Sequence, residues 1–190
     1  NLLGNEAGRI IYEGCTLIAH GTQGLVAAGP TFSFAEFQLT TATVDLALNR
    51  LYRRQRQSLF PLPAEGGVHC IFCPFSWKSL PSAAAHSPLP PFALEDKRVE
   101  FTRAGTLGLW DYLRKSRSRG FVISASGGID SSALVVLVWL LIQLAEQELG
   151  RAQLRSRLGS AWPTDFPPDA DLAHLMSHLL LTLYQGSENS

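Results

Sequence analysis

The spacing of apolar side chains predicts β-structure in the first quarter of the chain. Three short apolar runs, bounded by glycine and polar turn residues, are typical of strands: residues 9–12, 16–19 and 25–28. Residues 20–24 contain two glycines, which predicts a hairpin turn between the second run and the third. Residues 39–46 are rich in β-branched side chains and predict a further strand. We therefore expect an antiparallel or mixed sheet over residues 1–46.

Helical patterns dominate the second half of the chain and also follow the last predicted strand. Four segments show them: residues 46–59, 107–113, 133–149 and 172–183. The first segment is basic and is expected to be partly helical. Gly150 is expected to stop the third helix, with a polar helical continuation over residues 151–158.

Prolines concentrate between the strand-rich and the helix-rich regions. Seven of the 11 prolines lie in residues 60–92, which predicts a linker or an extended strap over a surface. A chain of 190 residues has room for one large or two small domains. We therefore divide it into an N-terminal part, residues 1–50, a proline-rich linker, residues 51–100, and a C-terminal part, residues 101–190.

One stretch connects a strand to a helix through two glycines. Residues 121–124 predict a buried parallel strand, and an apolar helix follows the glycines. The stretch consists of Ser124, Ala125, Ser126, Gly127, Gly128, Ile129, Asp130 and Ser131. The glycines lack Cβ, so the backbone can take positive φ and approach a ligand closely. The unpaired amides and the dipole of the following helix favour an anion at this point.

The polar side chains of this stretch indicate a phosphate site with a metal ion. Ser126, Ser131 and Ser132 can donate hydrogen bonds to phosphate oxygens. Asp130 is unfavourable beside a phosphate unless a cation lies between them, which suggests Mg²⁺. No lysine follows Lys115, which excludes a Walker loop, and the third glycine of a dinucleotide fingerprint is missing. The alternative without a ligand is a helix capped by serine or aspartate after a glycine turn.

Other candidate residues have simpler interpretations. His69, Cys70 and Cys73 form an H-C-x-x-C pattern, but no second cysteine pair completes a four-ligand zinc site, and the proline-rich context does not favour a redox site. His174 and His178 have the i,i+4 spacing that can bind a metal, but they lack the glutamate of H-E-x-x-H. We interpret the H-C-x-x-C pattern as coincidence or packing, the histidines as a surface pair, and the arginines of residues 46–59 as a solvated or interface face.

Composition and charge give information on which kinds of partner the protein is expected to bind. Lys+Arg and Asp+Glu both number 16, so net charge gives no argument for nucleic acid or an anionic membrane. The longest apolar run, residues 133–142, is too short to span a bilayer, and no signal peptide is visible. Three cysteines do not make a disulfide framework. We expect a cytoplasmic protein with no nucleic-acid or membrane partner.

The glycine stretch resembles the S-G-G-x-D-S pyrophosphate loop of the ATP pyrophosphatases, and more of the chain resembles glutamine-dependent NAD synthetase. Three segments are similar to its ligase domain: GFVISASGGIDSS (120–132), LWDYLRKS (109–116) and TLYQGSENS (182–190). Three upstream segments resemble the last third of its nitrilase-like glutaminase domain: residues 4–14, Gly29-Pro30 and LTTATVD (39–45).

This resemblance implies a fold and a reaction. The α/β fold would join the C-terminal part of a nitrilase-like α-β-β-α sandwich to the start of an adenine-nucleotide α-hydrolase-like, Rossmann-like parallel-sheet domain. The carboxylate of deamido-NAD would attack the α-phosphorus of ATP, giving an adenylate and pyrophosphate, and ammonia from glutamine would then displace AMP. Ser126 would be the catalytic residue, residues 124–131 would bind ATP, and Asp130 would hold Mg²⁺. The full-length protein is expected to be a homo-oligomer.

Some residues depart from the pattern of this family. Its glutaminase uses a Glu–Lys–Cys set whose cysteine lies upstream of the part resembling Asn1, and Cys15 is interpreted as a packed thiol. Ala125 replaces a commoner leucine. We therefore expect a piece that spans a domain junction and is inactive alone. Another ATP-pyrophosphatase ligase, such as a GMP synthetase or a tRNA-thiolating enzyme, and a non-catalytic ATP-binding module are the alternatives.

Overall fold

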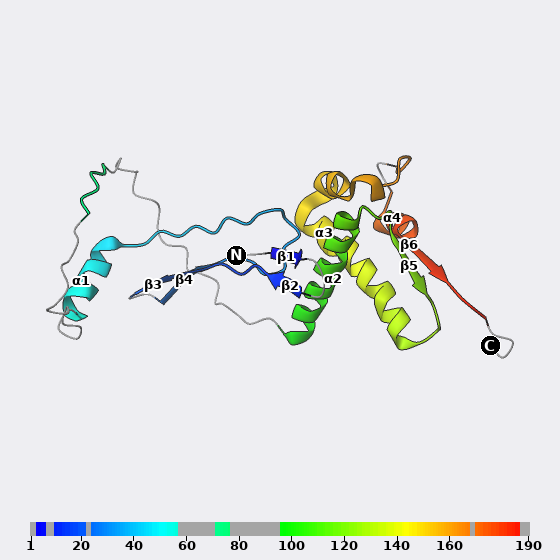
Figure 1. Ribbon diagram of the computed structural model, residues 1–190, viewed down its shortest axis with the longest axis horizontal. Coiled ribbons are helices and arrows are strands. Elements are labelled where there is room, and N and C mark those ends of the chain that lie inside the picture. The colour runs from blue at the N-terminus through cyan, green and yellow to red at the C-terminus, as the bar shows by residue number, and fades with distance from the viewer. Residues whose placement is uncertain are drawn as a thin grey trace. The chain divides into compact units, whose positions relative to one another are not determined.

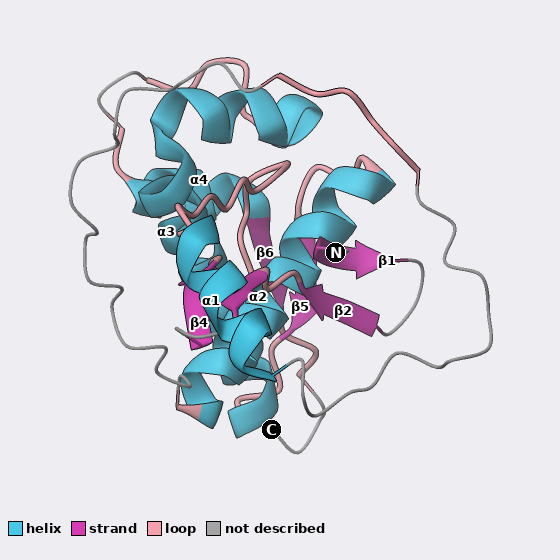
Figure 2. Ribbon diagram, turned by 90° about the vertical axis from the view of Figure 1, so that its left-hand side faces the viewer, coloured by secondary structure: helices cyan, strands magenta, loops and turns pink. Residues whose placement is uncertain are grey.

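The protein has an α/β fold. The computed structural model describes residues 3–6, 10–21, 24–56, 71–76, 96–167 and 170–186. Its helices and strands succeed one another along the chain (Figures 1 and 2). Contacts divide the chain into two compact units: the first comprises Asn1–Thr16, Pro30–Gln38 and Ala93–Ser190, and the second comprises Leu17–Gly29 and Leu39–Phe92. The boundaries at residues 50 and 100 expected for the parent protein stay predictions.

The described residues of the second unit form a hairpin and one helix. β3 (Leu17–His20) and β4 (Gly24–Ala28) pair antiparallel, which confirms the predicted hairpin. α1 (Leu46–Arg56) confirms the predicted helix as far as Arg56, since residues 57–59 lie outside the described ranges. The Asp45 carboxylate accepts hydrogen bonds from the Ala47 amide at 2.7 Å and the Leu48 amide at 3.3 Å. This acceptor satisfies amides that have no partner inside the helix.

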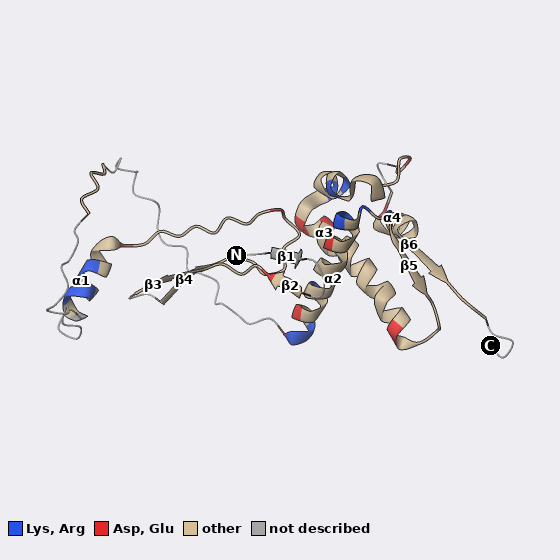
Figure 3. Ribbon diagram, viewed as in Figure 1, with Lys and Arg blue, Asp and Glu red and all other residues tan. Residues whose placement is uncertain are grey.

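The predicted strand over residues 39–46 is wrong. No strand covers residues 39–45, and Leu46 already begins α1. A β-branched run forms a strand only where a neighbouring strand accepts its backbone groups, and none of the described strands pairs with it. Its apolar side chains are accordingly solvated, with Leu39 81 % exposed. The arginines of α1 lie on the surface as predicted, with Arg50, Arg53 and Arg54 exposed (Figure 3).

The first unit begins with a hairpin on a helix. β1 (Leu3–Glu6) pairs antiparallel with β2 (Ile10–Glu13), and α2 (Lys97–Ser116) packs against both strands. The absence of a side chain at Gly108 permits this approach, because a Cβ there would lie 2.7 Å from Ile11 Cδ1. α2 starts at Asp96, whose carboxylate accepts from the Arg98 amide at 2.8 Å. The sequence did not predict β1.

Three helices enclose the core of the first unit. α3 (Ile129–Leu158) packs against α2 and α4 (Leu172–Leu179), with the short 3-10 turn η2 (Gly159–Ala161) following α3. Its largest fully buried side chains include Trp110, Leu107, Leu113, Leu141, Ile142, Leu154, Leu175 and Leu179. The predicted interruption of α3 is confirmed, since Gly150 has φ 74° and ψ 160° between two helical stretches. The wide apolar surface that these helices remove from water is the main stabilising contribution.

A parallel strand pair completes the first unit. β5 (Phe121–Ser124) pairs parallel with β6 (Leu180–Leu183), in the register Phe121↔Leu180 to Ser124↔Leu183. The parallel strand predicted at residues 121–124 is therefore confirmed, but its expected burial is not: Ile123 is buried, whereas Val122 is 65 % exposed. The helix predicted over residues 172–183 ends at Leu179 instead, because the last four residues join the strand ladder. A continuous apolar run satisfies helix and strand patterns equally, and the pairing with β5 decides between them.

α3 also bears on the question of a membrane span. Among the described residues, one helical stretch, Ile129–Ala161, is long and apolar enough to cross a membrane by length and composition. The sequence had offered only the ten-residue run 133–142. This finding is weak evidence for a span, because the core helix of a soluble protein meets the same criterion.

Candidate phosphate-binding site

The glycine stretch begins where the parallel strand pair ends. The Ala125 amide donates to the Leu183 carbonyl at 2.7 Å, which extends the ladder one residue beyond Ser124. Ile123 is buried beneath this edge and anchors β5 in the core. Ligand sites of parallel α/β sheets lie at the carboxyl ends of strands, which is where the residues after Ser124 are placed.

The backbone of the turn differs at its two glycines. Gly127 has φ 75°, the left-handed region that favours glycine. Gly128 has φ −83° and ψ 168°, an ordinary extended conformation, and forms the N-cap of α3 without a side-chain cap. The expectation that both glycines would supply positive φ is therefore correct for Gly127 alone.

Hydroxyl groups hold the start of α3 together. Ser131 and Ser132 both donate to the Gly128 carbonyl, at 3.1 Å and 3.0 Å. The Gly128 amide approaches Ser126 Oγ at 3.4 Å, and Ser126 Oγ lies 3.5 Å from Ser131 Oγ. Two of the three serines expected to face phosphate are therefore engaged with the turn itself. Ser126 is exposed and is the hydroxyl best placed for a ligand.

The electrostatics of the turn favour an anion only with a cation beside it. The first amides of α3 have no acceptor inside the helix, and the helix dipole adds partial positive charge. Asp130 lies in the first helical turn and is exposed (Figure 3). No lysine or arginine occurs between Arg119 and Arg151, so the strand, turn and first half of α3 carry no cationic side chain. A polyphosphate here would need a cation from solution.

A single carboxylate can hold Mg²⁺ only when substrate phosphates and water supply the other ligands. Mg²⁺ in nucleotide sites is held by one or two carboxylates together with substrate phosphates and water. Asp130 supplies one exposed carboxylate directly beside the amides that would hold the phosphates. Within the described ranges, no three His, Cys, Asp or Glu side chains gather as a metal site. The donor set therefore fits Mg²⁺ bound with a nucleotide and does not form a metal site of its own.

The predicted site residues form one contiguous surface. All are exposed except Ala125, which is half-buried, and Ser131, which is buried. Ile129 is 85 % exposed, so an apolar side chain also borders the turn. Backbone amides, the Ser126 hydroxyl and the Asp130 carboxylate are thus available to a ligand. This arrangement can bind and orient a polyphosphate, and it contains no nucleophile paired with a base.

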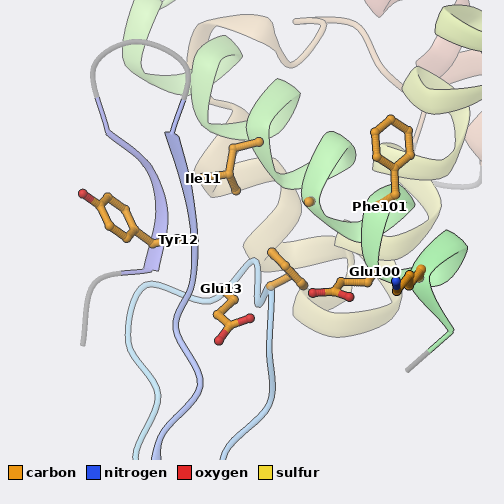
Figure 4. Close-up of a pocket in the computed structure, with 8 residues that line it drawn as sticks. Ile11, Tyr12, Glu13, Glu100 and Phe101 are labelled. Atoms are coloured by element: carbon orange, nitrogen blue, oxygen red, sulfur yellow. The ribbon is translucent and has the colours of Figure 1, made fainter. Parts of the chain in front are cut away.

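Two hollows in the first unit lie apart from the glycine turn. The larger, of about 610 Å³, is an open groove between β2 and α2, lined by Ile11, Tyr12, Glu13, Phe32, Lys97, Glu100, Phe101 and Ala104. Figure 4 shows Glu13 of β2 and Glu100 of α2 on its two sides. The two carboxylates outnumber the one ammonium of the lining, that of Lys97, so the charge of this groove does not favour a polyphosphate.

The smaller hollow has a volume of about 260 Å³ and is lined in part by Glu148 of α3. The Glu148 carboxylate accepts from the Ser33 hydroxyl and, at 3.1 Å, from the Phe34 amide. The Phe34 ring meets the Trp110 ring edge-on, with centroids 5.8 Å apart. Sequence reasoning missed this contact, because 115 residues separate Ser33 from Glu148 and no local pattern marks the pair.

The other candidate residues are dispersed. His69 and Cys70 lie outside the described residues, and Cys73 is exposed. Cys15 is half-buried, in keeping with the expected packed thiol. His174 and His178 face each other on the exposed side of α4, with their Nε2 atoms 3.3 Å apart. Cys15, His174 and His178 do not line the glycine turn.

The fold and this turn define an α/β protein in which glycines join a parallel strand to a helix N-terminus. No family model matches the chain. Over 198 residues it is 33 % identical to the glutamine-dependent NAD(+) synthetase of Oryza sativa subsp. indica, an alignment that covers 100 % of this chain and 26 % of the relative. It is 32 % identical over 205 residues to that of Saccharomyces cerevisiae, covering 100 % of this chain and 28 % of the relative.

A solved structure gives the same match. The crystal structure of a glutamine-dependent NAD(+) synthetase from Cytophaga hutchinsonii superposes with a TM-score of 0.67 at 30 % identity, covering 100 % of this chain and 25 % of that one. The resemblance seen in the sequence is confirmed: the chain is similar along its whole length to glutamine-dependent NAD(+) synthetases. It spans about a quarter of the length of these relatives.

Proposed function

We propose that the chain is a piece of a glutamine-dependent NAD synthetase, and that residues 124–131 bind the phosphates of ATP. The parent enzyme would amidate deamido-NAD to NAD, cleave ATP to AMP and pyrophosphate, and take its ammonia from glutamine. The observation that carries the proposal is the similarity of the entire chain to enzymes of that name, together with the glycine turn at the end of a parallel strand.

The residues of the turn have distinct proposed roles. The backbone amides at the start of α3 would hold phosphate oxygens, and the Ser126 hydroxyl would donate to them. The Asp130 carboxylate would hold Mg²⁺, which when bound offsets charge on the leaving pyrophosphate. Ser131 and Ser132 would keep the Gly128 carbonyl in place, so that the turn holds its shape without a ligand. These groups bind and orient; the attacking carboxylate would come from deamido-NAD.

The proposal extends to the organisation of the parent. Residues 1–50 would be the end of a nitrilase-like glutaminase domain, residues 51–100 a linker, and residues 101–190 the start of a Rossmann-like ligase domain. The isolated chain would be inactive as a synthetase, and it would lack glutaminase activity in particular, since no Glu–Lys–Cys set can be assigned within it. We place the parent enzyme in the cytoplasm as a homo-oligomer. Similarity along residues 1–50 favours this enzyme over ATP-pyrophosphatase ligases that lack a nitrilase-like domain.

Two measurements on the full-length parent test the proposal. NAD formation and pyrophosphate release would be followed with deamido-NAD, ATP and Mg²⁺, using ammonia as the amide donor. Amide exchange of residues 124–131 would be compared with and without ATP. We expect turnover together with protection of the turn. ATP binding without pyrophosphate release would favour the non-catalytic module, and turnover that leaves the turn unprotected would place the nucleotide elsewhere.

A further inference from the structure

Two imidazoles on α4 are arranged as a chelating pair. His174 and His178 lie one helical turn apart, so their side chains leave the helix on the same face. The two Nε2 atoms are 3.3 Å apart, and the ring centroids are 5.0 Å apart with 55° between the planes. The same nitrogen of each ring therefore faces its neighbour within hydrogen-bond distance, on the exposed side of the helix.

The nitrogen separation matches a particular coordination geometry. With Zn–N distances of about 2.0–2.1 Å and a tetrahedral angle, two coordinating nitrogens lie about 3.4 Å apart. An octahedral angle at the same distances would bring them to about 2.9 Å. The observed 3.3 Å fits both a direct hydrogen bond between the two imidazoles and two adjacent positions of a tetrahedral centre, so a metal ion can take the place of the shared proton with little movement of the rings.

The surroundings hold the rings in this geometry. The His174 ring packs against the Phe166 ring with centroids 5.4 Å apart, and Phe166 in turn meets Trp162 edge-on at 4.8 Å. The Asp171 carboxylate accepts from the His174 amide at 2.9 Å and fixes the start of the helix. Leu175, the residue after His174, is buried and anchors the helix. One imidazole is thus oriented by packing, while His178 is exposed and can adjust.

We propose that His174 and His178 form a surface site for Zn²⁺, the ion whose tetrahedral geometry fits this separation. Imidazole nitrogen suits Zn²⁺, whereas Mg²⁺ prefers oxygen ligands; Cu²⁺, which imidazole also binds in a tetragonal geometry, serves as the spectroscopic probe. The two histidines occupy two positions, and water or another exogenous donor fills the others. The site is separate from the Asp130 carboxylate and independent of the nucleotide chemistry proposed above.

The place of the site in the fold gives it a structural consequence. α4 passes directly into β6, and the Leu183 carbonyl at the end of β6 accepts from the Ala125 amide at the start of the glycine turn. A metal bridging His174 and His178 joins two successive turns of an eight-residue helix. Occupancy should therefore slow amide exchange in α4 and β6.

Calorimetric titration of the metal-free full chain with ZnCl₂ tests the proposal, and Cu²⁺ electron paramagnetic resonance identifies the ligands. We expect one bound ion, two imidazole nitrogens in the Cu²⁺ spectrum, and no displacement by excess Mg²⁺. His174→Ala and His178→Ala should each weaken affinity by more than about tenfold, since loss of a supporting partner alone costs that much. Ser177→Ala, an exposed neighbour on the same helix, is the control and should bind normally.

The H-C-x-x-C motif is the competing metal site, so the titrations are repeated in a Cys70→Ser/Cys73→Ser background. Binding that persists there and disappears with His178→Ala supports the proposal. His178→Ala removes an exposed side chain and keeps the buried face of α4, and circular dichroism verifies that it is folded. Absence of binding in the full chain, binding unchanged by both histidine substitutions, or displacement by Mg²⁺ would overturn the assignment.

Discussion

The hydroxyl of Ser33 donates a hydrogen bond to the carboxylate of Glu148, across 115 positions of the sequence. Both the hydroxyl and the Phe34 amide beside it, which donates to the same carboxylate at 3.1 Å, belong to buried residues. A second contact between the same segments, the Arg157–Glu36 ion pair at 3.0 Å, is more exposed. The Glu148 contact is therefore the one expected to matter for stability.

Removal of this acceptor should destabilise the protein. Glu148→Ala removes an acceptor from two buried donors; because Glu148 is itself exposed and lines a hollow, water can take its place, and the expected loss is about 1 kcal/mol in total. Glu148→Gln keeps one acceptor oxygen and should lose less. Urea unfolding of the full-length protein measures both changes, with Gln143→Ala, an exposed substitution on the same helix, as the control. A Glu148→Ala protein as stable as the control would contradict the importance of the contact.

The same contact predicts an effect on coupling between the proposed domains. Ser33 lies in the part proposed to end the glutaminase domain, and Glu148 lies on α3 of the proposed ligase domain. Glu148→Ala should lower glutamine-driven NAD formation about fivefold or more relative to ammonia-driven formation, which is the lower end of usual coupling free energies. The ratio of the two rates in the full-length enzyme is the measurement. An unchanged ratio would limit Glu148 to a structural role.

Asp130→Asn should leave the fold intact and reduce NAD formation sharply. The side chain is exposed, so the free energy of unfolding should change by less than about 1 kcal/mol, the usual size of a helix-dipole contribution. Loss of the charge that holds Mg²⁺ should lower the rate on the order of a thousandfold, a transition-state effect of several kcal/mol. Ammonia-driven synthesis measures this rate, and Asp165→Asn, another exposed aspartate, is the control. Wild-type rates in Asp130→Asn would refute the metal assignment.

Local sequence signals predicted those elements whose stability is largely local. The hairpin at residues 16–28 and the break at Gly150 depend on turn chemistry and apolar spacing within a few residues. The strand at residues 121–124 was also predicted from its apolar run, although its partner is the distant β6. Residues 39–45 and 180–183 were assigned wrongly because strand formation depends on a partner. β6 exists where β5 accepts it, whereas residues 39–45 have no such neighbour among the described strands.

The sequence predicted which residues form the candidate site, but it did not predict their conformation. Its residues are contiguous, so the sequence placed them together correctly. The sequence did not predict that Gly127 has a positive φ and Gly128 does not, because residue types do not specify dihedral angles. Nor did it predict that the Ser131 and Ser132 hydroxyls bond within the turn. Contacts such as Ser33 with Glu148 require the tertiary fold.

Gly120 should tolerate no side chain, because β5 and the end of α4 meet there. A Cβ at Gly120 would lie 2.4 Å from the Leu179 carbonyl oxygen, and a backbone atom cannot rotate away. Gly120→Ala should therefore destabilise the protein by about 1–3 kcal/mol, as other overpacked sites do. Gly105→Ala is the matched control, since its Cβ would lie at an ordinary contact distance of 3.7 Å from the Leu137 side chain. Gly105 lies in α2, and alanine forms helices better than glycine by up to about 1 kcal/mol. Thermal unfolding should show a lower melting temperature for Gly120→Ala than for the unsubstituted protein, and no such decrease for Gly105→Ala. Equal melting temperatures of the two variants would refute the packing argument.

Substitutions at the two glycines of the turn should have different effects, and together they test its conformation. At Gly127 an added Cβ meets nothing within 4 Å, so the cost arises from φ 75° alone, about 1–2 kcal/mol for alanine and more for valine. At Gly128 the backbone is unstrained, but a Cβ would lie 3.3 Å from Ser126 Oγ and displace the hydroxyl proposed to contact phosphate.

Gly127→Val should therefore lower both the free energy of unfolding and ATP affinity, because relief of the strain changes the path of the turn. Gly128→Ala should retain stability and weaken ATP binding or turnover through Ser126. In a Ser126→Ala background that second effect should largely vanish, since the displaced hydroxyl is already gone. Chemical unfolding and ATP titration with Mg²⁺, performed on each variant of the full-length protein, separate the two mechanisms. Unchanged ATP affinity in Gly127→Val would exclude the turn as the phosphate site, and a Gly128→Ala defect that persists without the Ser126 hydroxyl would assign the effect to the backbone amides instead.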